Sequence, residues 1–190
     1  MTAKILDGSA VSKQILAEIK DQTSVFQAEW KSTPTLALMR VGDDPASVSY
    51  AKMIERTCNK VGMVFQSHTL PSDATEDQAV RLMRKLNDDD NVHGIILQQP
   101  LPESIHAEAV VEAMDPAKDV DGAHPLNAGR LARAAFVDSP QNVGPYFVPA
   151  TPLGGLELLK RYAIPVDGQR AVIVGASNLI GKPMSLLLTR

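Results

Sequence analysis

The chain has 190 residues, of which 44% are hydrophobic and 22% are charged, and its formal net charge is −3. These values are ordinary for a globular protein. The slight acidity and the lack of a Lys/Arg stripe argue against nucleic acid as a partner. No apolar run approaches the ~20 residues that a membrane span needs, so we also expect no membrane partner.

Cysteine content and the N-terminal sequence bear on the compartment. Cys58 is the only cysteine, which excludes an internal disulfide and a cysteine-rich metal site. The opening stretch MTAKILDGSAVSK has no apolar region of the kind found in a secretory signal. We therefore expect a cytoplasmic protein without a bound metal.

Strands and helices alternate from the start of the chain. Apolar residues at helical spacing predict a helix over residues 9–29, and TPTLALMRVG predicts a short buried strand over residues 33–42. Asp44 is suited to cap the next helix, with Pro45 at its first position. The predicted apolar face of that helix consists of Ala46, Tyr50, Met53, Ile54, Cys58 and Val61.

The same alternation continues to residue 114. MVFQSHTL predicts a strand, and Thr75 with Gln78 forms a capping-box pattern at the start of another helix. VHGIILQ is a nearly continuous apolar run, typical of a central parallel strand. AEAVVEAM predicts a helix. This order predicts βαβ units, with a mostly parallel sheet between helices on both faces, a three-layer α/β domain.

The rhythm breaks over residues 115–151, which are rich in Pro, Asp, Gly and Asn and are interpreted as a connection. A helix is predicted over residues 152–163 and a strand over RAVIVG. We therefore expect a first domain over residues 1–150 and the start of a Rossmann domain over residues 151–190. Because one strand cannot make a sheet, we expect that residue 190 is not the natural end and that about a hundred further residues complete the second domain.

Three stretches are candidates for chemistry, and the first is VGASNLIGKP. Gly175 ends the predicted strand and Gly181 lies in the turn into the following helix. A glycine lets the backbone approach a phosphate, and free N–H groups at a helix start favour an anion. The spacing is not G-x-G-x-x-G, and a tight turn without a ligand explains the pattern equally well.

The second candidate stretch is HGIILQQPLPES. Gln98 and Gln99 lie at the carboxyl end of a predicted strand, where open α/β sheets present functional side chains. A glutamine offers one acceptor and two donors, which suits the edge of a polar heterocycle. A solvated strand end explains the position as well.

The third candidate stretch is DPAKDVDGAHP. Asp119 and Asp121 flank a valine, so in an extended chain their side chains point the same way. A metal, a cationic ligand or solvation would each accommodate the two charges, but nearby spacing does not support a metal cage. An Asp-rich turn is the simplest interpretation, and His124 is expected to be a surface or capping residue.

Taken together and in order, these stretches resemble one family. VGDDPAS, HGIILQQPLP, PAKDVDGAHPLNAGRL, PATPLGGLELL and VIVGASNLIGKPMSLLL are similar to the methylenetetrahydrofolate dehydrogenase/cyclohydrolase (FolD-type) family. The resemblance runs through essentially the whole chain, and its most specific blocks are KDVDG and GASNLIGKPM.

The resemblance implies an N-terminal α/β domain and a C-terminal Rossmann domain facing each other across a folate-binding cleft. It implies an enzyme that passes hydride from 5,10-methylenetetrahydrofolate to NADP⁺, and in many members hydrolyses the methenyl product to 10-formyltetrahydrofolate. Family members commonly form homodimers, so a homodimer is expected. The residues alone leave NAD and NADP open, because those that read the ribose lie beyond the second Rossmann strand.

The resemblance also implies roles for particular residues. Tyr50 is expected to border the folate, Gln98 to touch the reacting region, and Asp121 to accept hydrogen bonds from the amino-pyrimidine edge of the pterin. Gly175, Ala176 and Ser177 are expected to hold the phosphate end of the cofactor.

Three departures from the family pattern stand out. Gln99 replaces the leucine of Gln-Leu-Pro, and Ala150 replaces the cysteine of Pro-Cys-Thr-Pro. The third departure affects chemistry: the family's Tyr-x-x-x-Lys supplies the key cyclohydrolase lysine, and here Ile54 stands at that position. Lys52 is the nearest substitute, but it lies about 200° around the helix from Tyr50, whereas position 54 lies about 40° away.

Two functions therefore remain open from the sequence. One is an NADP-dependent dehydrogenase of folate metabolism with little cyclohydrolase activity. The other is a folate-binding homologue without catalysis, which Ile54 and the early end of the chain favour. A shikimate-type dehydrogenase lacks support from KDVDG.

Overall fold

The computed structural model describes residues 3–135 and 144–189. The chain divides into two compact units, a sheet unit of residues 17–120 and a helical unit of residues 1–16 with 121–190. The first helix, α1 (Gly8–Trp30), contributes residues to both units.

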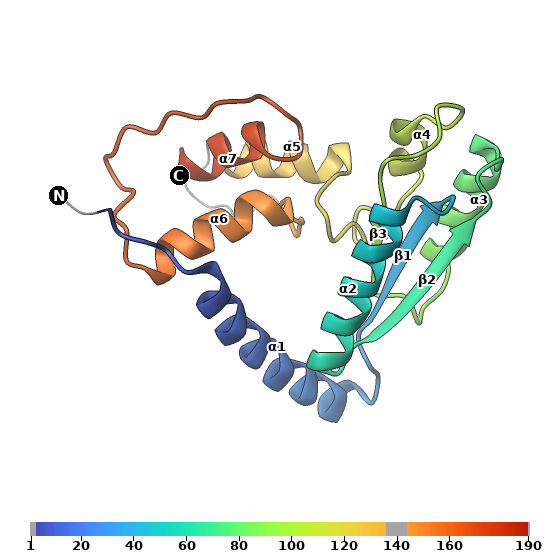
Figure 1. Cartoon of the computed structure of the whole chain (residues 1–190), viewed down its shortest axis with the longest axis horizontal. Helices are drawn as coiled ribbons and strands as arrows, with labels where there is room; N and C mark the ends of the chain where they lie inside the picture. Colours follow the sequence, from blue (N-terminus) through green and yellow to red (C-terminus); the bar gives the residue numbers. More distant parts are fainter. Residues whose placement is uncertain (1–2, 136–143, 190) are drawn as a thin grey trace. The chain divides into compact units, whose positions relative to one another are not determined.

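The sheet unit is built on three parallel strands, β1 (Thr35–Val41), β2 (Val64–Leu70) and β3 (Gly94–Leu97). Their order is β2-β1-β3, so β1 lies in the middle (Figure 1). Leu38 and Met39 of β1 are fully buried. The structure confirms the predicted mixed α/β fold with a parallel sheet.

The position of β3 differs from the central place that its apolar run predicts. In the described part of the chain β3 pairs with β1 on one side, and on its other side it makes one isolated bridge, between Ile95 and Asp119. The bridging segment turns at once, because the Val120 N–H donates back to the Lys118 carbonyl at 3.0 Å. β3 is buried nonetheless, since this segment covers its outer edge.

The helices of the sheet unit begin where their capping residues predict. α2 (Pro45–Val61) starts after Asp44, whose carboxylate accepts a first-turn N–H at 2.8 Å. α3 (Glu76–Asn87) starts with the predicted capping box, in which Thr75 and Gln78 bond each other's backbone N–H groups. α2 packs on β1 and β2, and α3 packs beside the short helix α4 (Ala107–Glu112).

The helical unit contains α5 (Pro125–Ala134), α6 (Ala150–Arg161) and α7 (Gly181–Leu188), all visible in Figure 1. These three helices share a small core of one leucine from each: Leu131, Leu156 and Leu187. Within the described ranges no helix is both long and apolar enough to cross a membrane.

Helix α5 is absent from the sequence prediction, which treats residues 115–151 as a connection. It begins after His124, whose Nδ1 accepts the Leu126 N–H at 3.0 Å, and Pro125 occupies its first turn. His124 is therefore a capping residue, as expected. The predicted connecting stretch also includes residues 136–143, which lie outside the described residues.

The predicted strand over RAVIVG does not form in the described structure. Val172 and Val174 are 82% and 98% exposed. A strand is stabilised by its neighbours, and among the described residues none pairs with this segment. The turn and helix predicted after it are present.

Candidate functional site

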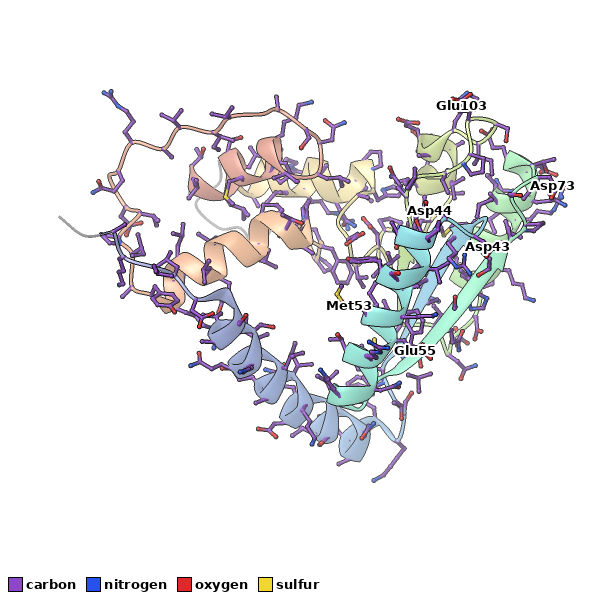
Figure 2. All side chains as sticks on the ribbon, viewed as in Figure 1. Asp43, Asp44, Met53, Glu55, Asp73 and Glu103 are labelled. Atoms are coloured by element: carbon purple, nitrogen blue, oxygen red, sulfur yellow. The ribbon has the colours of Figure 1, made fainter. Side chains whose placement is uncertain are left out.

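The carboxyl edge of the parallel sheet carries several candidate residues. The loops after β1, β2 and β3 all leave from this edge, because parallel strands end on the same side. Figure 2 labels acidic side chains on these loops: Asp43, Asp44, Asp73 and Glu103. Among the described residues no group of three His, Cys, Asp or Glu side chains is arranged to hold a metal ion.

Gln98 directly follows β3 at this edge. Its backbone N–H extends the ladder by donating to the Met39 carbonyl at 2.8 Å. Its side-chain Nε2 donates to the Gln99 carbonyl at 2.8 Å, which orients the amide. The other end, Oε1, is buried and is without a hydrogen-bond partner among the described residues. A buried acceptor left unpaired costs about 1–3 kcal/mol, so a hydrogen-bond donor that reached this oxygen would be favoured.

Helix α2 presents Tyr50 to solvent. Its buried face consists of Ser47, Ala51, Cys58 and Val61, which pack toward the sheet. The apolar face predicted from the sequence is therefore wrong in part, because Tyr50 and Met53 are 47% and 52% exposed. The sheet contacts a neighbouring stripe of the helix, and this leaves an aromatic ring and a thioether uncovered.

Position 54 lies between the exposed and buried faces of α2. Ile54 is half-buried, whereas Lys52 lies on the opposite flank. There Lys52 and Glu55 line a pocket of about 210 Å³ with Arg40 and Phe65. Figure 2 shows Met53 and Glu55 leaving α2 on opposite sides. Lys52 is thus on the far side of the helix from Tyr50, as helical geometry predicts.

The two carboxylates of KDVDG have different surroundings. Asp119 is fully buried in the sheet unit, so of the explanations left open by the sequence, solvation does not apply to it. Its burial follows from the bridge with Ile95, which fixes the backbone against β3. Asp121 is half-buried and is the first residue of the second segment of the helical unit.

The backbone around position 122, next to Asp121, has room only for a glycine. Its φ is +64°, and a side-chain Cβ would lie 2.6 Å from the backbone nitrogen of Pro149. Only glycine permits this approach at this φ. The Asp-Gly pair is therefore packed against the start of the PATP segment that leads into α6.

The turn before α7 contains the three residues proposed to hold a phosphate. Gly175 has a φ of +117°, and a Cβ on Gly181 would collide with the Gly175 carbonyl. The Ser177 hydroxyl accepts the N–H groups of Ile180 and Gly181 at 3.2 and 3.4 Å. Gly175, Ala176 and Ser177 are all exposed. The structure brings them together in one tight, accessible turn.

A pocket of about 390 Å³ in the helical unit joins the surroundings of Gly122 to this turn. Asn178 and Lys182 line it, and the Lys182 ammonium donates to the Asn178 side-chain oxygen at 2.7 Å. Sequence reasoning missed both residues. In the sequence the two residues stand four positions apart, directly after Ser177, and this spacing brings side chains together on a helical turn.

Cys58 is not a candidate nucleophile. Its side chain is 4% exposed on the face of α2 that packs toward the sheet. Burial raises the pKa of the Cys58 thiol. The thiol therefore stays protonated and unreactive in the folded unit.

Comparison with known proteins identifies two matched regions. Residues 6–121 match the tetrahydrofolate dehydrogenase/cyclohydrolase catalytic domain, and residues 149–190 match the NAD(P)-binding domain of the same family. The bifunctional protein FolD of Wolinella succinogenes is 43% identical over 185 residues, covering 97% of this chain and 62% of that protein. The FolD protein of Heliobacterium modesticaldum is 44% identical over 190 residues, covering 100% and 63%.

Solved structures agree with these matches. The bifunctional FolD enzyme of Campylobacter jejuni superposes with a TM-score of 0.90 at 38% identity, covering 97% of this chain and 62% of that one. The Trypanosoma brucei dehydrogenase-cyclohydrolase, solved with NADP cofactor and inhibitor, gives 0.89 at 28% identity, covering 99% and 62%. The chain thus spans somewhat under two thirds of the length of these relatives. On its matched domains and its motifs, the chain belongs to the tetrahydrofolate dehydrogenase/cyclohydrolase family.

Proposed function

We propose that this chain binds a tetrahydrofolate derivative and takes part in the NADP-dependent oxidation of 5,10-methylenetetrahydrofolate to 5,10-methenyltetrahydrofolate. The observation that carries the proposal is the unpaired, buried Oε1 of Gln98. The family resemblance gives this residue a place at the reacting region. A reduced pterin carries several N–H groups, any of which would satisfy such an acceptor.

The other two candidate residues have the properties that their roles require. The exposed ring of Tyr50 is free to stack on a flat heterocycle. Asp121 offers two acceptor oxygens for an amino-pyrimidine edge, a geometry that a carboxylate matches well. Each residue acts by binding and orienting the folate, and none of the three is proposed to exchange a proton with it.

The turn before α7 fits a dinucleotide phosphate. Gly175 and Gly181 approach so closely that a side chain on the second would displace the turn. Gly175, Ala176 and Ser177 are exposed in the turn that leads into α7, and an anion is favoured near a helix N-terminus. When bound there, NADP⁺ supplies the hydride acceptor, and the protein supplies position and electrostatics.

We further propose the wider setting that the family suggests. Residues 1–150 would form the folate-binding catalytic domain, and residues 151–190 the linking helix and first elements of the NADP-binding domain. The working protein would be a cytoplasmic homodimer. The NADP bound by the Trypanosoma brucei relative supports the choice of cofactor.

A second candidate function is folate binding without catalysis. Ile54 favours it, because an aliphatic side chain occupies the position of the family's cyclohydrolase lysine. Following NADPH formation with 5,10-methylenetetrahydrofolate as substrate separates the two. Formation above the blank supports the dehydrogenase, and folate binding without it supports the second function.

The role of Gln98 is tested by a matched pair of variants. Gln98→Met keeps the length of the side chain and removes the acceptor, whereas Gln99→Met changes the exposed neighbour and keeps its backbone carbonyl. We expect Gln98→Met to raise the Kd for 5,10-methenyltetrahydrofolate about tenfold, the effect of one lost hydrogen bond in a desolvated site. Calorimetry measures the Kd. Equal effects of the two variants would refute the assignment of Gln98.

A further inference from the structure

Lys118 lies inside the KDVDG block, yet its ammonium group binds the protein itself. The Nζ atom donates to the carbonyls of Asn87 and Asp89 at 2.7 and 2.8 Å, and to that of Leu86 at 3.4 Å. An ammonium has three donors, and all three are used here. The first accepting carbonyls belong to the last turn of α3, where helical carbonyls lack partners and the helix dipole favours a cation.

The backbone of Lys118 joins the same place to β3. Its carbonyl accepts the Ile95 N–H at 2.7 Å and the Val120 N–H at 3.0 Å. Its own N–H donates to the Asp115 carbonyl at 2.8 Å. Lys118 thus ties the end of α3 to the strand that leads, three residues later, to Gln98.

Two neighbouring contacts hold the same segment. Val120 packs where a Cβ on Gly94 would stand, with its Cγ1 2.5 Å from that position. Asn87 donates to the Ala113 carbonyl and accepts the Asp115 N–H, both at 2.8 Å. The segment is therefore fixed up to Val120, the residue before Asp121.

We propose that Lys118 is a positioning residue of the folate site, which holds β3 and residues 119–120 in register so that Gln98 and Asp121 leave from fixed backbone. The proposal rests on the folate-binding function proposed above. Lys118 touches neither folate nor cofactor, because its three donors are bound to α3 and the following turn. The ammonium group of Lys118 thus stabilises the fold and is not needed to bind the ligand.

The test compares Lys118→Met with Lys118→Arg, and uses Lys85→Met as the control. Lys85 is an exposed cation in the last turn of the same helix, so its removal changes the charge of α3 without touching β3. Two quantities are measured in the whole chain: the Kd for 5,10-methenyltetrahydrofolate, and the exchange rates of the Ile95 and Val120 amides. Both amides donate to the Lys118 carbonyl.

We expect Lys118→Met to raise the Kd about tenfold, as misplacement of binding groups does, and to speed exchange of both amides. Compared with Lys118→Met, Lys118→Arg should recover part of the affinity and part of the amide protection, because a guanidinium can donate to two carbonyls. Lys85→Met should change neither the Kd nor the exchange rates. A folded Lys118→Met protein with the original Kd, or with unchanged exchange at both amides, overturns the proposal.

If Lys118→Met does not fold, the Lys118→Arg variant provides the test. Weaker folate binding by Lys118→Arg, with the Ile95 and Val120 amides still fully protected, also overturns the proposal. Failure of the unaltered chain to bind the folate would instead refute the proposed function, while the exchange rates still test the contact.

Discussion

Asp119 and Asp121 are two residues apart and differ in exposure. Asp119 is fully buried against β3, and Asp121 is half-buried. A fully buried carboxylate is inaccessible to a ligand, whereas a half-buried one has part of its surface exposed. From this difference we expect Asp119 to act in folding, and we propose that Asp121 acts in pterin binding.

This assignment predicts separable effects. Asp121→Ala should weaken folate binding by about 2–5 kcal/mol, because a desolvated charged contact is lost. Asp121→Asn should also weaken it, since the amide presents a donor where an acceptor is needed. Asp119→Asn should lower the urea midpoint of unfolding and leave the Kd of the folded protein nearly unchanged. Equal losses of affinity at the two positions would show that the wrong carboxylate has been assigned.

Ile54 leads to a prediction about the second activity of the family. Hydrolysis of the methenyl cation needs an activated water and a managed proton, which a lysine with a tuned pKa provides and an isoleucine does not. We expect hydride transfer without accelerated decay of methenyltetrahydrofolate. Ile54→Lys should increase that decay, and Lys52→Met should not reduce it, because Lys52 lies on the other flank of α2. Decay by the unaltered protein well above the buffer blank would disprove this prediction.

Among the elements, the loop after β3 is anchored at its far end. The Glu76 carboxylate, in the first turn of α3, accepts the backbone N–H of His106 at 2.8 Å and bonds its Nδ1 at 2.7 Å. The hydrogen bond from the His106 backbone N–H, and after it the bond with the His106 side chain, hold the pKa of the Glu76 carboxyl below its ordinary value. The loop that begins with Gln98 is thus tied to α3 at His106.

The lowered pKa of the Glu76 carboxyl determines in which direction the stability of the fold changes with pH. The bond contributes stability above the pKa of Glu76 in the unfolded chain, and this stability is lost as the pH falls through the lower pKa of the folded state. We expect Glu76→Gln to lower the urea midpoint at about pH 6, and the difference from the unaltered protein to shrink toward about pH 3. Glu103→Gln, an exposed carboxylate in the same loop, is the control. A difference that is constant with pH would show that the Glu76 charge makes no contribution.

Local sequence determines the ends of elements better than their faces. The caps at Asp44 and Thr75 involve neighbours within three residues, so the sequence alone predicts them. Which stripe of α2 is buried depends on β1 and β2, which are distant in the chain, and the prediction for Tyr50 and Met53 was wrong for that reason. The segment 170–175 shows the same limit, because strand propensity does not supply a pairing partner.

At the scale of the whole molecule, motif order predicted more than any single motif. Each candidate stretch also fitted a structure without a ligand, yet the matched family domains cover residues 6–121 and 149–190. Contacts across the sequence could not be foreseen in this way. Gly122 against Pro149, Lys118 against the end of α3 and the burial of Asp119 all depend on how the chain folds back on itself.

Because the chain has a single cysteine, the rate at which Cys58 is alkylated measures how often the sheet unit opens locally. Cys58 belongs to α2 and lies on its buried face, so its thiol becomes accessible to an alkylating reagent when that helix detaches from the sheet. Each labelled molecule therefore records one opening event, with no second thiol to confuse the count. The rate of labelling in buffer reports how often α2, which carries Tyr50 and Ile54, leaves its place under native conditions.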